Sequence, residues 1–249
     1  MARRFRLNQS QRVKWAGTLN IAEPLTLIGW QRRLGVPVSG MVMIALDTEA
    51  GSSRWQLGTN STDQVSGVAA NTVGTSANPL AGTTLLYVWH CIACVFTSST
   101  SRTSYLDGVP GATDTTAITV SGVDSVRMGA RVASSVEAIY SDADYAGVCV
   151  YNVALTTAEI MAYSLGHIPR PQNIVFRPDL RGGELGVRDL IVPSRYLTAA
   201  TALKTPSIAS DAPLVHGLAR SAKIFDFAVA ATVAGGTYIP SVVRRRARR

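Results

Sequence analysis

Two of the three cysteines are spaced as in pairs of thiols that hold a zinc ion or undergo redox chemistry. They are Cys91 and Cys94, and they lie inside an apolar run from Leu85 to Phe96. Such a run is typical of a β-strand, in which residues three apart point to opposite faces. The two thiols then cannot bind one ion or bond to each other. We therefore expect ordinary buried cysteines, and three cysteines cannot form a disulfide framework.

Arginine is concentrated at both ends of the chain, and eight of the 24 lysines and arginines lie in the first or last six residues. These eight are Arg3, Arg4, Arg6, Arg244, Arg245, Arg246, Arg248 and Arg249. The other 16 cationic residues equal the 16 acidic ones in number, so the body of the chain is neutral. Guanidinium groups pair with carboxylates or phosphates through a rigid fork. We expect the clusters to bind acidic patches on partner proteins; contact with nucleic acid and simple solvated ends are the alternatives.

The composition is that of a folded domain. The chain has 249 residues, of which 47% are hydrophobic and 16% charged. No apolar run approaches the roughly 20 residues that cross a bilayer. The basic start of the chain is not followed by the apolar segment of a signal peptide. We therefore expect no signal peptide, no transmembrane segment and no membrane partner.

Short segments in which apolar and polar residues alternate, separated by turn residues, indicate many β-strands in a sandwich or barrel. The expected strands are Leu25–Trp30, Met41–Leu46, Ser53–Gly58, Gln64–Ala70, Leu85–Thr97, Thr103–Leu106, Ile118–Val120, Ser125–Gly129 and Tyr145–Tyr151. Asp107 and Gly108 lie between Tyr105-Leu106 and Val109-Pro110. They predict a two-residue hairpin turn, because both residues tolerate positive φ.

One short helix is expected, from Thr156 to Leu165. Thr156 and Glu159 have the spacing of a capping box, in which each side chain bonds the backbone of the other residue. Gly166 follows as a natural C-terminal residue. Pro169 and Pro171 then prevent continuation, so a domain boundary is expected at this point.

The middle of the chain resembles the laminin-G-like, or concanavalin A-like, jelly-roll superfamily. The segments that carry the resemblance are Trp89–Ala93, Tyr105–Gly108, Val126–Gly129, Tyr145–Asn152 and Leu155–Ile160. Their order and spacing across about residues 20–165 are similar to those of the family. The resemblance implies an all-β fold: an antiparallel jelly-roll β-sandwich with one short helix. We expect a basic N-terminal arm at 1–17, the sandwich at 18–168, and an extended C-terminal region with an arginine-rich tail at 169–249.

The same superfamily includes glycoside hydrolases, whose E-x-D-x-x-E signature places catalytic carboxylates on one face of a strand. This chain contains no such string, and its acidic residues are scattered. The close pair Asp47 and Glu49 is expected to be a solvated turn. Serine nucleophile elbows, P-loops and H-E-x-x-H motifs are also absent from the sequence. We therefore expect no enzymatic activity, with a degenerate glycoside hydrolase as an alternative.

Two kinds of binding site follow from the resemblance. Laminin-G-like domains often hold a calcium ion, and Asp142 and Asp144 are the candidates with suitable oxygen ligands, although loop solvation explains them equally well. Beyond calcium we expect no cofactor. Sugar binding would need exposed aromatic rings, and Trp55, Tyr140 and Tyr145 are the candidates.

The function expected from these features is that of a non-enzymatic structural protein of a bacteriophage virion, in capsid decoration, a head fibre or the tail. Made in the host cytoplasm, it would attach to other virion proteins through its terminal arms, form a homo-oligomer and display the lectin-like sandwich. The alternative is a carbohydrate-binding adhesin for host or environmental glycans.

Overall fold

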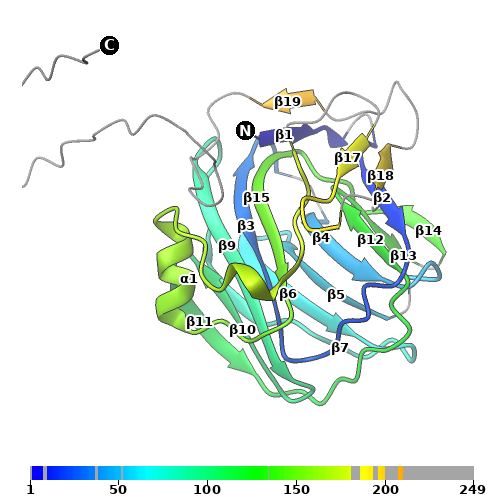
Figure 1. Cartoon of the computed structure of the whole chain (residues 1–249), viewed down its shortest axis with the longest axis vertical. Helices are drawn as coiled ribbons and strands as arrows, with labels where there is room; N and C mark the ends of the chain where they lie inside the picture. Colours follow the sequence, from blue (N-terminus) through cyan, green and yellow to red (C-terminus); the bar gives the residue numbers. More distant parts are fainter. Residues whose placement is uncertain are drawn as a thin grey trace, which may run out of the picture. The chain divides into compact units, whose positions relative to one another are not determined.

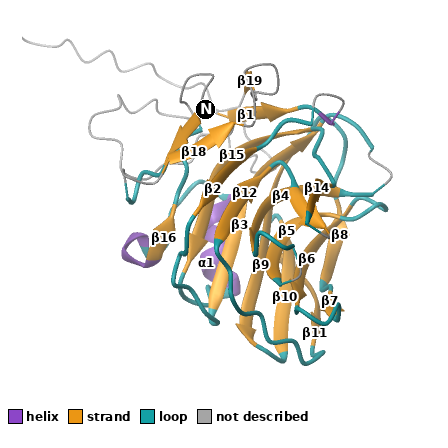
Figure 2. Cartoon of the chain, turned by 90° about the vertical axis from the view of Figure 1, so that its right-hand side faces the viewer, coloured by secondary structure: helices purple, strands orange, loops and turns teal. Residues whose placement is uncertain are grey.

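A computed structural model of the chain describes residues 2–7, 10–36, 39–51, 53–133, 135–180, 186–192, 196–199 and 207–209. Within these residues the chain forms two large antiparallel sheets that enclose one main apolar core, and a small two-stranded sheet (Figures 1 and 2). The fold class expected from the sequence, an antiparallel β-sandwich with one short helix, is confirmed.

The first sheet, which we call sheet A, has the strand order β11-β10-β9-β3-β15-β1-β19, and β16 also pairs with β15. Its strands are β1 (Ala2–Phe5), β3 (Leu25–Arg33), β9 (Trp89–Ser98), β10 (Ser101–Leu106), β11 (Val109–Asp114), β15 (Ala143–Tyr151), β16 (Ile174–Phe176) and β19 (Ser207–Ala209). β1 and β16 pair with the same edge of β15, one after the other along its length. The two ends of β15 therefore have different neighbours.

The second sheet, sheet B, has the order β17-β18-β2-β12-β4-β5-β6-β7, with β8 also paired to β6. Its strands are β2 (Val13–Ala16), β4 (Met41–Asp47), β5 (Arg54–Thr59), β6 (Gln64–Ala70), β7 (Ser76–Ala77), β8 (Leu80–Thr83), β12 (Ser125–Met128), β17 (Gly186–Arg188) and β18 (Tyr196–Ala199). A separate hairpin is formed by β13 (Arg131–Ala133) and β14 (Val136–Ala138).

The long strand β9 carries apolar residues on both of its faces. Ile92, Cys94 and Phe96 belong to the core between the sheets. Cys91 and Ala93 belong to a second cluster on the outer face. This alternation is the one expected from the sequence, and it separates the two thiols as predicted. All three cysteines are free and buried.

The outer cluster is covered by the helix α1 (Thr157–Ser164). Thr156 and Glu159 form the predicted capping box, and Gly166 has a φ of +91° after the helix. Ile160 and Tyr163 are the fully buried residues of α1. A short 3₁₀ turn, η2 (Pro171–Asn173), then leads into β16. The predicted helix is confirmed, and it covers one end of the outer face of sheet A.

The β10–β11 hairpin turns at Asp107 and Gly108, whose φ angles are +50° and +84°. This prediction is confirmed, because both residues adopt the positive φ that such a turn requires. Two expected strands differ. Ile118–Val120 is not a strand, and the strand expected from Leu85 begins at Trp89 instead. Leu85 to Val88 form an exposed loop, since an apolar run by itself does not distinguish a buried strand from an exposed segment.

The expected N-terminal arm is corrected by the structure. Within 1–17, β1 pairs with β15 in sheet A and β2 pairs with β12 in sheet B. The C-terminal boundary changes in the same way, because β16 pairs with β15 and β18 pairs with β2. The sandwich therefore includes strands from both sides of the segment 18–168. Most of 200–249 lies outside the described residues.

Candidate functional site

One row of side chains crosses four strands of sheet A at the end that α1 does not cover. Trp89 of β9 pairs with Arg32 of β3, Arg32 with Asp144 of β15, and Asp144 with Arg4 of β1. Because directly opposed residues of neighbouring strands lie on one face, the four side chains form a line. Ala143 and Tyr145 point into the core, so this row lies on the outer face.

Asp144 is the centre of this row. Its side chain has no exposed surface, and both carboxylate oxygens accept hydrogen bonds from arginine. Arg4 donates from Nε at 2.8 Å and from Nη2 at 3.1 Å. Arg32 donates from Nε at 3.0 Å and from Nη2 at 2.7 Å. The Arg32 guanidinium also lies 5.2 Å from the centre of the Trp89 ring, a cation–π distance. The carboxylate thus fixes two guanidinium groups side by side.

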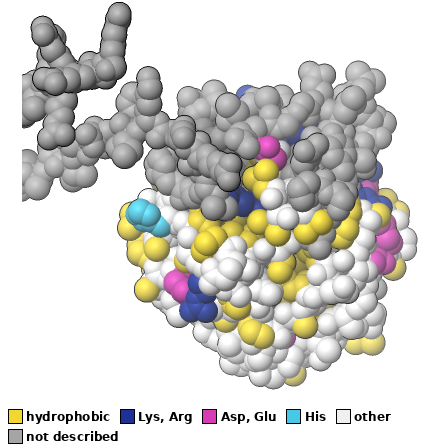
Figure 3. All heavy atoms as spheres, in the orientation of Figure 1, with side chains coloured by type: hydrophobic (Ala, Val, Ile, Leu, Met, Phe, Trp, Pro, Cys, Tyr) yellow, Lys and Arg dark blue, Asp and Glu magenta, His cyan; other side chains and the backbone are white. Residues whose placement is uncertain are grey.

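A cavity of about 440 Å³ lies over this row, lined by Arg4, Arg6, Arg32, Leu34 and Tyr87. It is open to solvent, because 40% of the Arg6 side chain and 68% of Tyr87 are exposed. In the space-filling view, the described surface on the α1 side is mostly uncharged, with only a few scattered charged side chains (Figure 3). Three arginines around one cavity are therefore a local concentration on a nearly neutral body.

Hydrogen bonds to β9 and β3 fix the loop that carries Tyr87. His90 accepts a hydrogen bond from the Leu85 N–H at Nε2, 3.1 Å away. The ring proton is therefore on Nδ1, which donates to Asp107 at 2.7 Å. The Tyr87 N–H donates to the Arg33 carbonyl at 2.9 Å. Tyr87 itself has a φ of +62°, a left-handed conformation that is costly for a large side chain. Such strain is concentrated at functional sites.

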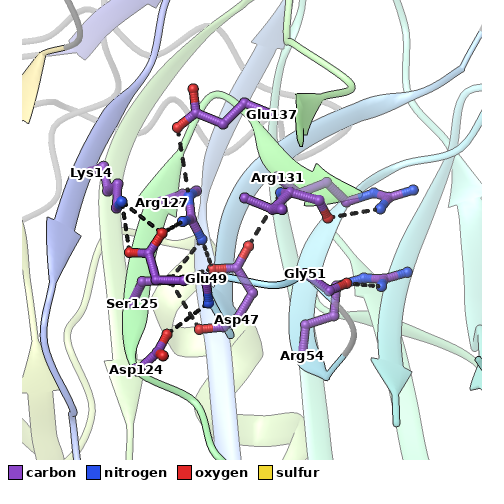
Figure 4. A network of polar contacts seen from close by, with 11 residues as sticks. Lys14, Asp47, Glu49, Gly51, Arg54, Asp124, Ser125, Arg127, Arg131 and Glu137 are labelled. Carbon is purple, nitrogen blue, oxygen red and sulfur yellow. Dashed lines mark hydrogen bonds and ion pairs between the residues drawn. The ribbon is translucent and has the colours of Figure 1, made fainter. Parts of the chain in front are cut away.

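A second cluster of charges lies on the outer face of sheet B, beneath the β13–β14 hairpin (Figure 4). Asp47, at the end of β4, is fully buried, and Arg127 of β12 is 1% exposed. Asp47 accepts hydrogen bonds from Arg127, from Ser125 at 2.6 Å and from the Val132 N–H at 3.3 Å. Arg127 also pairs with Glu49 at 2.7 Å.

Burial dominates the electrostatics of this second cluster. It raises the pKa of Asp47, although Arg127 opposes the rise. It lowers the pKa of Arg54, on the neighbouring strand, to about 10. The carboxylates of Asp47 and Glu49 both pair with cationic side chains, and Asp47 has no exposed surface, whereas 45% of the Glu49 side chain is exposed. The expected solvated turn is corrected for Asp47, which is a buried ion-pair partner under a hairpin.

A family model for the concanavalin A-like lectin/glucanases superfamily matches residues 7–161. The chain belongs to this superfamily. The resemblance seen in the sequence is thereby confirmed for most of the sandwich. A search of the curated proteins gave no match.

Solved structures with the same fold are distant in sequence. A heptameric SAP-like pentraxin from Limulus polyphemus is 13% identical, with a TM-score of 0.55 over 68% of this chain and 84% of the pentraxin. A candidate carbohydrate-binding protein from Bacteroides ovatus is 15% identical, with a TM-score of 0.61 over 80% of this chain and 58% of that protein. At these identities the similarity shows the fold of this superfamily member.

The geometry disfavours the calcium site predicted at Asp142 and Asp144, which stays a prediction. Asp144 has both oxygens bonded to Arg4 and Arg32, and Asp142 pairs with Arg6 at 3.5 Å. A calcium ion would have to displace guanidinium groups and would lie among three positive charges. No group of three or more metal-ligating side chains occurs in the part of the chain that the structure describes.

The structure corrects the predicted sugar-stacking rings. Trp55 is 3% exposed and donates from Nε1 to Glu23 at 3.0 Å. Tyr145 has no exposed surface, and its hydroxyl donates to the Val42 carbonyl at 3.1 Å. Tyr140 is half-buried. Two of the three rings therefore belong to the core and cannot stack on a ligand.

The structure describes the N-terminal arginines but not the C-terminal ones. Arg3 lies in β1 and is 1% exposed, while Arg4 and Arg6 line the cavity. The three N-terminal arginines are thus part of the sandwich and its surface, which corrects the expectation of a basic arm. Arg244, Arg245, Arg246, Arg248 and Arg249 lie outside the described residues.

The sequence did not single out Arg32, Leu34, Tyr87 or Trp89 as site residues. Tyr87 was assigned to a strand, and Arg32 is far from Arg4 and Asp144 in the sequence. The sequence contained a weak signal that the Tyr87 segment is a loop. The strand from Trp89 onward is of ordinary length without the apolar run Leu85 to Val88, so this run did not have to belong to it. No helix among the described residues has the length and apolar character needed to span a membrane.

Proposed function

We propose that the chain is a carbohydrate-binding module and that its glycan site is the cavity lined by Arg4, Arg6, Arg32, Leu34 and Tyr87. The observation that carries this proposal is the combination of an exposed aromatic ring with fixed planar hydrogen-bond donors at one open cavity. We refer to this cavity as the arginine pocket.

The chemistry of a sugar fits these groups. The C–H face of a sugar ring packs on an aromatic face, and Tyr87 offers a ring that is 68% exposed. Sugar hydroxyl oxygens accept hydrogen bonds, and each guanidinium carries five N–H donors in a rigid fork. Arg4 and Arg32 are already ordered by Asp144, so little entropy is lost when they bind.

The superfamily and the fold support the proposal. The chain belongs to a superfamily described as lectins and glucanases, and the Bacteroides ovatus protein with the same fold is a candidate carbohydrate-binding protein. We propose further that this module is not catalytic. The close carboxylate pairs Asp47 with Glu49 and Asp142 with Asp144 all contact arginine, which disfavours the general acid and nucleophile of a glycosidase.

A glycan array probed with the full chain tests the proposal, followed by calorimetry on each hit. Tyr87→Ala should reduce affinity about tenfold or more, because the stacking ring is lost. Tyr140→Ala is the matched control, since it removes the one half-buried ring of the three that the sequence singled out. Equal losses for both variants, or binding to no glycan at all, would refute the assignment. Hydrolysis of a bound glycan would refute the non-catalytic proposal.

The role in a bacteriophage particle remains a prediction from the sequence. It rests on the arginine-rich ends, of which the C-terminal cluster, 244–249, lies outside the described residues. Co-purification of the chain with assembled particles, lost on deletion of 244–249, is the expected result. Unchanged attachment after that deletion at physiological salt would contradict it.

A further inference from the structure

We infer that the arginine pocket selects glycans that carry an anionic group, a carboxylate or a sulfate. This inference rests on the proposed function for the sugar part of the ligand. The preference for an anion follows from the charges around the pocket.

The charges around the pocket favour an anionic ligand. Three guanidinium groups line the pocket, those of Arg4, Arg6 and Arg32. Within the described residues, Arg4 and Arg32 pair with Asp144 and Arg6 pairs with Asp142, and these five side chains together carry a net charge of +1. Asp144 has no exposed surface and is shared between two arginines, so a ligand meets the cations rather than this carboxylate. An anionic ligand would balance the positive charge of these five side chains.

The arginines of the pocket have N–H donors that a ligand can use. Arg4 uses Nε and Nη2 for Asp144, and its Nη1 group makes no hydrogen bond within the described part of the chain. Among the described residues, Arg6 has one ion pair, with Asp142 at 3.5 Å, and its side chain is 40% exposed. These N–H groups are available to a ligand. Charge-assisted bonds from guanidinium to an oxyanion are about twice as strong as neutral ones.

The pocket also has an apolar wall, so its lining suits a larger ligand than an inorganic anion. Leu34 and Tyr87 form an apolar part of its wall, which an inorganic ion would not use. Tyr87 is held in a left-handed conformation at this wall. A ligand that uses every lining group has an acidic substituent next to an apolar ring face, which is the structure of a uronic acid, a sialic acid or a sulfated sugar.

The test compares acidic oligosaccharides with their neutral counterparts on the full chain. One arm pairs carboxylated oligosaccharides with the same molecules after carboxyl reduction, and the other pairs sulfated oligosaccharides with the desulfated ones. The arms separate the two sources of the anion. We expect the acidic member of at least one pair to bind about tenfold tighter, a difference of about 1.4 kcal/mol, and the preference to weaken with added salt.

Two variants locate the effect. Arg6→Gln should remove most of the preference for the acidic glycan. Arg170→Gln is a closely matched control, because Arg170 is 41% exposed and also pairs with one carboxylate, that of Glu159, beside α1. Arg170→Gln should change nothing. The inference is overturned if Arg6→Gln keeps the preference or if both variants lose it equally.

The remaining outcomes separate this inference from the proposed function. Equal binding of acidic and neutral glycans overturns the anion preference and leaves glycan binding intact. If no glycan binds, titration with inorganic sulfate shows whether the pocket binds an anion at all. The amide NMR signals of Leu34 and Tyr87 are the readout. Shifts at both residues support an anion site without a sugar site. Unshifted signals overturn the inference together with the proposed function.

Discussion

The outer faces of the two sheets each hold an aspartate bonded to arginine, but only one of the two clusters is covered. On sheet B, the β13–β14 hairpin lies over Asp47 and Arg127, and the two side chains are 0% and 1% exposed. On sheet A, Asp144 is equally buried, but Arg4 and Arg32 keep 28% and 13% of their side chains exposed. The same pairing of residue types therefore holds the fold together in one place and presents donors to solvent in the other.

The largest effect is expected from the covered cluster. Arg127→Ala should lower the free energy of unfolding by about 3–5 kcal/mol, because it leaves the buried Asp47 carboxylate without its cation. Denaturant unfolding followed by circular dichroism measures it. Arg170→Ala, at an exposed ion pair, should change stability by no more than about 0.5 kcal/mol. A loss below about 1 kcal/mol for Arg127→Ala would show that the two clusters do not differ as described.

The corresponding change at the open cluster should cost less. Asp144→Asn removes the charge that orders Arg4 and Arg32, and about 1–3 kcal/mol of stability should be lost. The loss is smaller than for Arg127→Ala because both guanidinium groups reach water. The same unfolding experiment measures it. A loss larger than that of Arg127→Ala would reverse the comparison.

At Tyr87, one substitution should change stability and glycan binding in opposite directions. Tyr87→Gly should raise the free energy of unfolding by up to about 1 kcal/mol, because glycine adopts a φ of +62° without steric cost. The exposed ring contributes little burial. Tyr87→Ala removes the same ring but keeps the strain, so it should show no gain. Both variants should lose glycan affinity. If Tyr87→Gly is destabilising by more than about 0.5 kcal/mol, the ring has a structural role.

The smallest expected effect concerns the rim of the covered cluster. Burial opposes any fall in the pKa of Glu49, but bonds from Lys14 and Arg127 outweigh it, and the pKa is lowered. A lowered pKa in the folded state gives stability at pH 7 that is lost as the pH falls through it. Glu49 is 45% exposed, so Glu49→Gln should cost about 0.5 kcal/mol at pH 7. Urea unfolding from pH 7 to pH 3 should show this difference disappearing, and a difference that grows toward acid would contradict the assignment.

The positions of the cysteines could be predicted from residues close to them in the sequence. Strand geometry alone placed Cys91 and Cys94 on opposite faces, and burial raises the pKa of Cys94 to about 12. Period-two alternation depends only on the chain itself, so it could be read without knowing any partner strand. The capping box at Thr156 was predictable for the same reason, because both of its residues belong to one turn.

The candidate site could not be predicted in this way. Trp55 and Tyr145 are aromatic residues of the right kind, but the structure buries both, and nothing local to either residue distinguishes a core ring from an exposed one. Likewise Asp142 and Asp144 carry the oxygen atoms that calcium prefers, but their partners are decided by which strands lie beside them. Arg4 comes from the first strand of the chain and reaches Asp144 only because β1 pairs with β15.

The sequence by itself determined the two faces of β9, the hairpin at Asp107 and the start of α1, because each depends on residues within a few positions of one another. It also determined the β-sandwich class and the superfamily, because these depend on the order and spacing of short segments along the chain. Only the tertiary structure decided that the first strand pairs with β15 in sheet A, that Asp47 is buried, and that three arginines and Tyr87 surround one cavity. Those outcomes depend on register between distant strands. A shift of one residue in the pairing of β1 with β15 would move Arg4 to the core face.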